Sequence, residues 1–201
     1  MQKFLKTAAV FIGGFFNAPA WIMYIYAYVF FVAPSLFQNS VFLQASSFFI
    51  LIVFPISFTI ALNQLKIVED VDSRDKGKRL IVMSVFLVAM LSLVAISAFL
   101  GNMDFIKFLL LIILPAVIGS IINKFWLLSV HVMSAATSAT IMAYLSGWPY
   151  HLVFILVVIV AWARVVEKKH TVSQVLAGAA LGILVTFLLL KAFFTPLQFA
   201  N

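Results

Sequence analysis

An arginine and a histidine six residues apart are the side chains best placed for chemistry in this very apolar chain. Arg164 precedes His170, and Thr171 and Gln174 follow it. Thr-x-x-Gln before an apolar run is typical of a capping box that begins a helix. We therefore expect His170 just outside a helix N-terminus. Free N–H groups and a nearby arginine favour an anion such as phosphate there.

A second polar position lies where another apolar segment begins, with Ser129 and His131. Small residues dominate the helix that follows, and Gly178 and Gly182 give the last apolar segment a similar face. Helices with such faces pack closely in membranes. If these two helices touch, His131 and His170 come together at the same depth. That both histidines are merely interfacial remains the alternative.

The loop 66–79 is the largest polar segment, and most of its residues are expected to form a solvated, charge-balanced loop. Four cations in it can contribute charge to a bound phosphate: Arg74, Lys76, Lys78 and Arg79. Four acids can instead hold Mg²⁺, as in a diphosphate-dependent prenyltransferase: Glu69, Asp70, Asp72 and Asp75. Such an enzyme needs a second acidic cluster, and only Asp104 and Glu167 remain elsewhere.

Composition places these positions in a polytopic membrane protein. The 201 residues are 65% hydrophobic and 9% charged, with a mean hydropathy of +1.20 and no cysteine. About 20 apolar residues span a bilayer. We expect an all-α bundle of six or seven transmembrane helices, forming a single domain over 1–201 with an interfacial N-terminal segment, 1–17. The expected spans are 19–37, 42–63, 80–100, 105–122, 128–147, 150–165 and 172–194.

The basic residues are distributed unevenly between the two membrane faces. With seven spans, all of the thirteen except Lys107 and Lys191 fall on the face that carries both histidines and the 66–79 loop. The positive-inside rule favours a cytoplasmic location for that face. The polar groups that could do chemistry therefore converge on one side of the membrane.

In this order and spacing, the three positions resemble the type 2 phosphatidic acid phosphatase (PAP2) superfamily of membrane lipid phosphatases. The family pattern is Lys-x6-Arg-Pro, then Pro-Ser-Gly-His, then Ser-Arg-x5-His-x3-Asp. The resemblance covers most of the chain from about residue 60. It is carried by Arg79 in the first motif, Asn123, Phe125, Trp126, Ser129 and His131 in the second, and Ala163, Arg164, His170, Gln174 and VLAGAALG in the third.

Several residues depart from that pattern. They are Leu80 for proline, Asp72 for lysine, Leu128 and Val130 around Ser129, Ala163 for serine and Gln174 for aspartate. The glutamine carbonyl can still accept a hydrogen bond, but it cannot offset the charge of an imidazolium. We also expect a capping role for Gln174 to compete with an orienting role on His170.

The resemblance implies roles for these side chains. His170 would attack the phosphoryl group, with Gln174 as its partner, and His131 would protonate the leaving oxygen. The phosphate-binding set, with the loop cations added, is Arg164, Arg79, Arg74, Lys76 and Ser129. No metal or cofactor is implied.

The implied function is a phosphatase acting on a lipid or polyprenyl phosphate or diphosphate. We expect a multi-pass protein of the plasma (inner) membrane whose partners are this substrate and membrane lipids, with no nucleic acid. Sites of this family commonly face away from the cytoplasm, so the side of the membrane stays open. Two other functions stay open. One is a PAP2-fold protein that binds or transports a phospholipid without hydrolysis, and the other is a Mg²⁺-dependent prenyl or phosphoalcohol transferase using the acids of 69–75.

Overall fold

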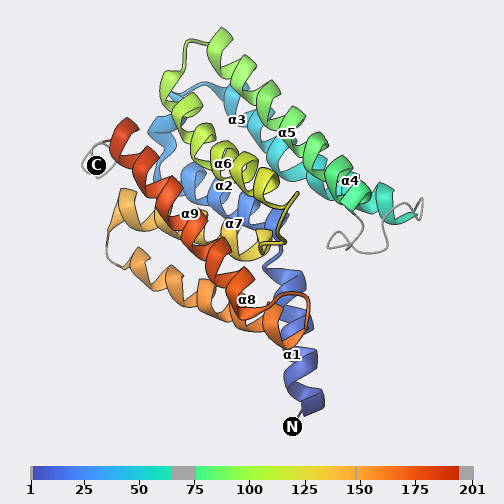
Figure 1. The fold of residues 1–201 in the computed structure, drawn as a ribbon. Coiled ribbons are helices and arrows are strands. Elements are labelled where there is room, and N and C mark those ends of the chain that lie inside the picture. Colours follow the sequence, from blue (N-terminus) through green and yellow to red (C-terminus); the bar gives the residue numbers. More distant parts are fainter. Residues whose placement is uncertain (1, 65–75, 148, 195–201) are drawn as a thin grey trace. The chain divides into compact units, whose positions relative to one another are not determined.

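The structure, a computed structural model, describes residues 2–64, 76–147 and 149–194, and these residues form helices and no strands (Figure 1). The predicted all-α class is therefore confirmed. The α-helices are α1 (Gln2–Phe15), α2 (Ala18–Val32), α3 (Val41–Phe48), α4 (Phe54–Gln64), α5 (Lys76–Phe99), α6 (Met103–Ile122), α7 (Val130–Ser146), α8 (Phe154–Val166) and α9 (Val172–Phe193). Short 3₁₀ segments lie at η1 (Pro34–Phe37) and η3 (Tyr150–Val153), and a π-helical turn lies at η2 (Phe49–Val53).

The chain forms two compact units. Unit 1 combines Met1–Tyr28 with Leu110–Asn201, and unit 2 is Val29–Leu109. Helices α2 and α6 contribute to both. Every residue of the second and third sequence motifs belongs to unit 1.

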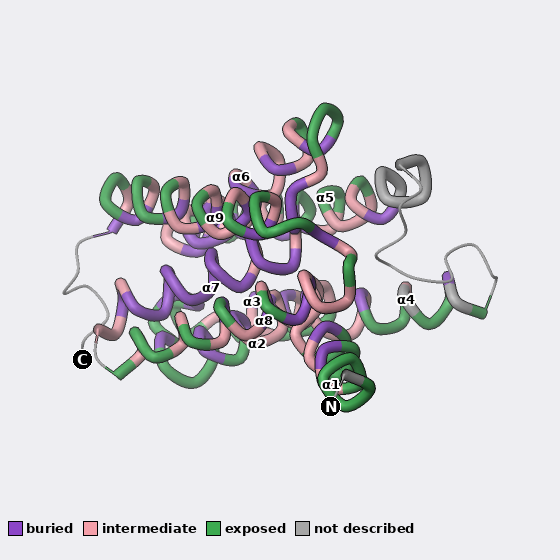
Figure 2. The backbone as a smooth tube through the Cα atoms, turned by 60° about the horizontal axis from the view of Figure 1, so that its bottom comes forward, coloured by how far each residue is buried: buried purple, intermediate pink, exposed green. Residues whose placement is uncertain are grey.

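Helix α7 is the centre of unit 1. Thirteen of its 17 residues are buried, and it packs against α8, α9 and η3. Figure 2 shows it mostly as buried backbone. Its alanines form a core with Trp21 of α2 and with valines of α8 and α9. Because neighbouring helices cover α7, it does not need large apolar side chains, which explains its small and polar composition.

The contact between α7 and α9 runs from backbone to backbone. A Cβ atom built at Gly178 would lie 2.5 Å from the carbonyl oxygen of Ser129, and one at Gly182 would lie 2.5 Å from that of Met133. Only glycine allows this approach. The contact between these two helices, which the sequence posed only as a condition, is therefore present.

Helix α1 packs along α8 within the same unit. A bend of 55° separates Lys3–Phe15 from α2, and Asn17 occupies it. The Asn17 side chain accepts a hydrogen bond from the N–H of Ala20 (2.8 Å) and donates one to the carbonyl of Gly14 (2.9 Å). One amide thus serves the end of α1 and the start of α2.

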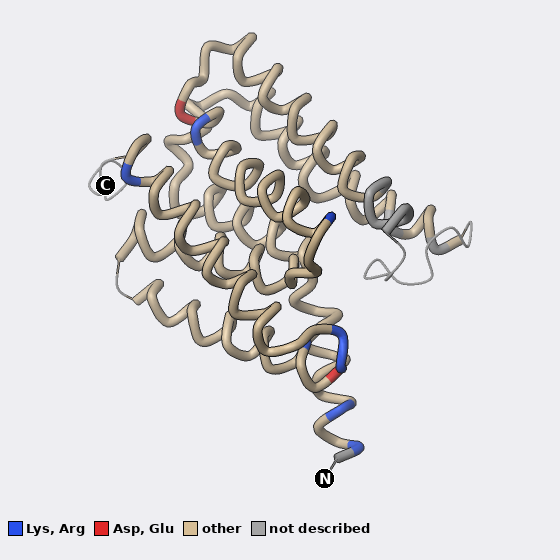
Figure 3. The backbone as a smooth tube through the Cα atoms, viewed as in Figure 1, with Lys and Arg blue, Asp and Glu red and all other residues tan. Residues whose placement is uncertain are grey.

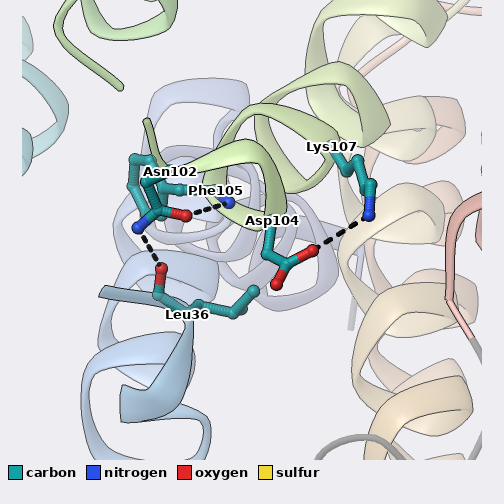
Figure 4. A network of polar contacts seen from close by, with 5 residues as sticks. All are labelled: Leu36, Asn102, Asp104, Phe105 and Lys107. Carbon is teal, nitrogen blue, oxygen red and sulfur yellow. Dashed lines mark hydrogen bonds and ion pairs between the residues drawn. The ribbon is translucent and has the colours of Figure 1, made fainter. Parts of the chain in front are cut away.

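In unit 2, α3, η2 and α4 form one apolar stretch beside α5. The π-helical turn ends two residues before Pro55, whose missing N–H cannot continue the regular pattern. Asn102 begins α6, as Figure 4 shows: its carbonyl accepts from the N–H of Phe105 (2.9 Å), and its amide donates to the carbonyl of Leu36 (2.8 Å). This side chain therefore ties η1 to the start of α6.

Four helices among the described residues are long and apolar enough to cross a membrane, or five if the bent pair α1 and α2 is one span. They are Val41–Leu62, Val82–Phe99, Met103–Ile122 and Val172–Phe193. The expected six or seven spans are not confirmed, because α7 is short and rich in small residues and α8 has only 13. The apolar helices indicate a membrane protein.

Candidate functional site

The first turn of α7 lies against the first turns of α9. The backbone N–H of Ser129 donates to the carbonyl of Gln174 (3.2 Å), and the Ser129 carbonyl accepts from Met133 (3.0 Å). Ser129 is the N-cap residue of α7, is fully buried, and its hydroxyl has no hydrogen-bond partner among the described residues. Two positions further on is His131, which is 8% exposed. A buried serine hydroxyl and a buried histidine thus open the central helix.

The start of α9 positions His170. Thr171 is the N-cap residue, its hydroxyl accepts from the N–H of Gln174 (3.4 Å), and Oε1 of Gln174 accepts from the N–H of Thr171 (3.0 Å). The predicted capping box is confirmed. The same Oε1 atom lies 3.3 Å from Nδ1 of His170. The expected competition between capping and orienting was wrong, because one carbonyl oxygen makes both contacts.

These contacts also determine the tautomer of His170. A backbone N–H can only donate, so the Gln174 atom that Thr171 reaches is the carbonyl oxygen. The Nδ1 atom of His170 must then carry a proton to bond with that oxygen. In the neutral ring, Nε2 is left as the unprotonated nitrogen, which can act as a nucleophile or a base.

The turn between α8 and α9 binds the backbone of His170 to Arg164. The carbonyl of Arg164 accepts from the N–H groups of Lys169 (3.2 Å) and His170 (3.3 Å). Lys168 has a φ of 58°, the left-handed conformation usual where such a helix end closes. The six-residue spacing thus corresponds to one compact turn.

The Arg164 side chain is buried, with 1% of the residue exposed. Its Nη1 donates to Oε2 of Glu167 at 2.9 Å, and Nζ of Lys169 lies 3.9 Å from Oε1 of the same carboxylate. A Cβ atom at Gly13 of α1 would lie 2.7 Å from Oε2 of Glu167 and 2.9 Å from Nη1 of Arg164. The N-terminal helix therefore touches the ion pair directly.

Sequence reasoning missed Glu167 and Gly13 as parts of this site. A glutamate three residues after an arginine near a helix end is a signal for pairing. The contact of Gly13 has no comparable signal, since it depends on how α1 packs.

The described residues bring together Ser129, Arg164, His170 and Gln174, and place His131 in the adjoining turn of α7.

Lys76 and Arg79 belong to the first turn of α5 in unit 2, and Arg74 lies outside the described residues. Basic residues mark both ends of α9 in Figure 3, with Lys169 before it and Lys191 in its last turn.

No group of three or more His, Asp or Glu side chains that could hold a metal ion occurs within the described ranges. The four acids of the Mg²⁺ hypothesis lie at 69–75, outside those ranges. The hypothesis that these acids hold Mg²⁺ therefore stays a prediction.

The fold and site define a helical membrane protein with a cluster of arginine and histidine side chains at two adjacent helix starts. Comparison with protein families adds that residues 120–197 match the PAP2 superfamily. This match confirms the resemblance seen in the second and third motifs, and the matched stretch contains Ser129, His131, Arg164, His170 and Gln174. This superfamily is of phosphatase type. No curated protein and no solved structure gives a significant match to the chain.

Proposed function

We propose that this protein is a membrane lipid phosphatase that hydrolyses a lipid or polyprenyl phosphate or diphosphate through a phosphohistidine intermediate, without a metal ion. The observation that carries the proposal is the contact between His170 Nδ1 and Gln174 Oε1. It orients the imidazole through Nδ1, so the lone pair of the neutral ring lies on Nε2, the proposed nucleophile. Arg164, joined to His170 by a backbone hydrogen bond, supplies a cation.

The proposed first step transfers the phosphoryl group to His170. The Nε2 lone pair forms a bond to phosphorus while the bond from phosphorus to the leaving oxygen breaks. His131, protonated at the start, gives its proton to that oxygen. Arg164 and the hydroxyl of Ser129 bind the phosphoryl oxygens as charge spreads over them.

The second step releases phosphate. His131 takes a proton from water, whose oxygen attacks phosphorus as the bond to Nε2 breaks. His131 is then protonated again and His170 is neutral. The cycle consumes one water and needs no other reactant.

The proposed partner is a lipid phosphate whose tail remains in the bilayer while its headgroup reaches the site. Large apolar side chains exposed on the long helices support a lipid environment for that tail. We place the protein in the plasma (inner) membrane and expect no nucleic acid partner.

One observation favours a second function, a protein that binds or transports a phospholipid without hydrolysing it. Nδ1 of the His170 imidazole lies against the neutral amide of Gln174, which cannot offset an imidazolium charge. Such a protein would use Arg164 to bind the headgroup and would form no covalent intermediate.

The test is phosphate release by purified protein in EDTA from phosphatidate, phosphatidylglycerophosphate and a polyprenyl diphosphate. We expect release from at least one of them, loss of release in His170→Ala, and an acid-labile phosphoenzyme in the wild type but not in His170→Ala. His151→Ala is the matched control, because His151 is exposed in η3 at the opposite end of α7.

Three results would count against the proposal. Release that EDTA abolishes would favour the Mg²⁺-dependent transferase, and release that persists in His170→Ala would exclude the nucleophile. Binding of the lipids without any release would favour the transport function.

A further inference from the structure

The ion pair between Arg164 and Glu167 is unusually well buried for a membrane-surface turn. The side chains are 2% and 6% exposed, and Nη1 and Oε2 are 2.9 Å apart. Removing charges from water is costly, and a buried pair persists only with good geometry and further hydrogen bonds. A buried ion pair often adds little to the stability of the fold. A contribution to stability therefore does not by itself explain why this pair lies beside His170.

Helix α1 forms the wall over this pair. At Gly13 the helix backbone comes so close that even a methyl group would collide with the ends of both charged side chains. Gly14, the next residue, is exposed, and an added Cβ there would meet nothing within 4 Å. The close approach is therefore specific to the position that faces the pair.

We propose that Glu167 is a positioning residue for Arg164 and that α1, through Gly13, closes over the pair to hold the guanidinium for a phosphate group. This inference rests on the proposed function of the same site. A guanidinium binds phosphate in its own plane, so its orientation matters as much as its charge. The backbone of Arg164 is already tied to His170, and Glu167 restrains the remaining freedom of the side chain.

Glu167 also supplies a negative charge beside the buried Arg164 before any substrate binds. It binds the Nη1 end of Arg164, so the planar fork is oriented before a phosphate arrives. Lys169, about one third exposed, extends the same network toward the surface. The negative charge of Glu167 thus pairs with the positive charge of Arg164.

The test compares Gly13→Ala with Gly14→Ala. Both changes replace a helical glycine of α1 by alanine, but only the new methyl group at position 13 would contact Arg164 and Glu167. Oε2 must move by about 0.7 Å, from 2.7 Å to the 3.4 Å at which ordinary contact begins. We expect Gly13→Ala to weaken binding of a non-hydrolysable phosphonate analogue of phosphatidate about tenfold, since displacements near 1 Å can cost about 10²-fold.

Glu167→Gln should weaken phosphonate binding in the same direction, with Glu167→Asp restoring part of it, and Gly14→Ala should bind like the wild type. Binding is the decisive readout because loss of folded protein lowers the number of sites but not their affinity. If Glu167→Gln does not fold, the two glycine variants still decide.

Equal affinities in Gly13→Ala and Gly14→Ala would overturn the inference, as would a wild-type protein that does not bind the phosphonate. Phosphonate binding that depends on Gly13 and Glu167, without phosphate release by the wild type, would support the inference while refuting the phosphatase. The two failures are therefore distinguishable.

Discussion

Replacing Gly178 by alanine should separate the two helices on which the site is built. The new Cβ would lie 2.5 Å from the backbone carbonyl oxygen of Ser129, and ordinary contact begins at 3.4 Å. The obstacle is backbone at the N-cap of α7, so no side-chain rotation can relieve it. The first turns of α7 and α9 must therefore move apart by about 0.9 Å, the difference between those distances.

The cost follows from two opposing terms. Overpacking a close contact costs about 1–3 kcal/mol, whereas alanine is a better helix former than glycine by about 0.5–1 kcal/mol. The net expectation for Gly178→Ala is a loss of about 1–2 kcal/mol of unfolding free energy. Gly14→Ala involves no overpacking, because its Cβ would meet nothing within 4 Å, and should be neutral or slightly stabilising. The two variants should therefore differ clearly in unfolding free energy.

The assay is thermal unfolding in detergent, paired with phosphate release per folded molecule. Gly182→Ala, whose Cβ would lie 2.5 Å from the carbonyl of Met133, should lose similar stability. Because Gly178 touches Ser129 itself, its variant should lose more activity, up to about 10²-fold for a displacement near 1 Å. A Gly178→Ala protein as stable as Gly14→Ala would refute the contact, and equal activity in all three would refute its relevance to the site.

Three further changes test the local geometry. Gln174→Glu keeps the oxygen that caps α9 and holds His170 and adds a negative charge, so phosphate release should rise several-fold; a fall would show that a neutral partner is required. Lys168→Gly should raise the unfolding free energy by about 1 kcal/mol, because a φ of 58° costs a side-chain-bearing residue about that much; an unchanged unfolding temperature would contradict this. Asn102→Ala should lose about 1–2 kcal/mol with its two hydrogen bonds, and Asn102→Asp, which keeps the acceptor, should lose less in the same unfolding assay; equal losses would refute the role of the side-chain carbonyl as the cap of α6.

Local features of the site were predictable from the sequence. The capping box at Thr171 and Gln174 depends on residues three apart, and side chains and backbone within one turn decide it. The close approach of α7 and α9 was predictable because small residues on both helices leave few other ways to pack in lipid. The capping box depends only on residues within one helical turn, and the close helix contact depends on small side chains that permit few other packings.

The number of spans was not predictable in the same way. Hydropathy identifies helices that face lipid, whereas α7 is surrounded by protein and carries alanine, serine and threonine. A hydropathy pattern also does not indicate which helices pack against one another. The segment 1–17 reads as generic apolar sequence, and its contact with Glu167 through Gly13 exists only once α1 lies on α8.

The site differs from the family pattern in where its negative charge lies. That pattern has a carboxylate at the position of Gln174, whereas here the buried carboxylate is Glu167, 2.9 Å from Arg164. In the proposed mechanism, attack by Nε2 of His170 would develop positive charge on a ring whose Nδ1 faces the neutral carbonyl of Gln174. In that mechanism the phosphoryl oxygens, bound by Arg164, would balance much of this charge. If the proposed mechanism holds, the orientation of Arg164 matters more to catalysis than it would beside a charged histidine partner.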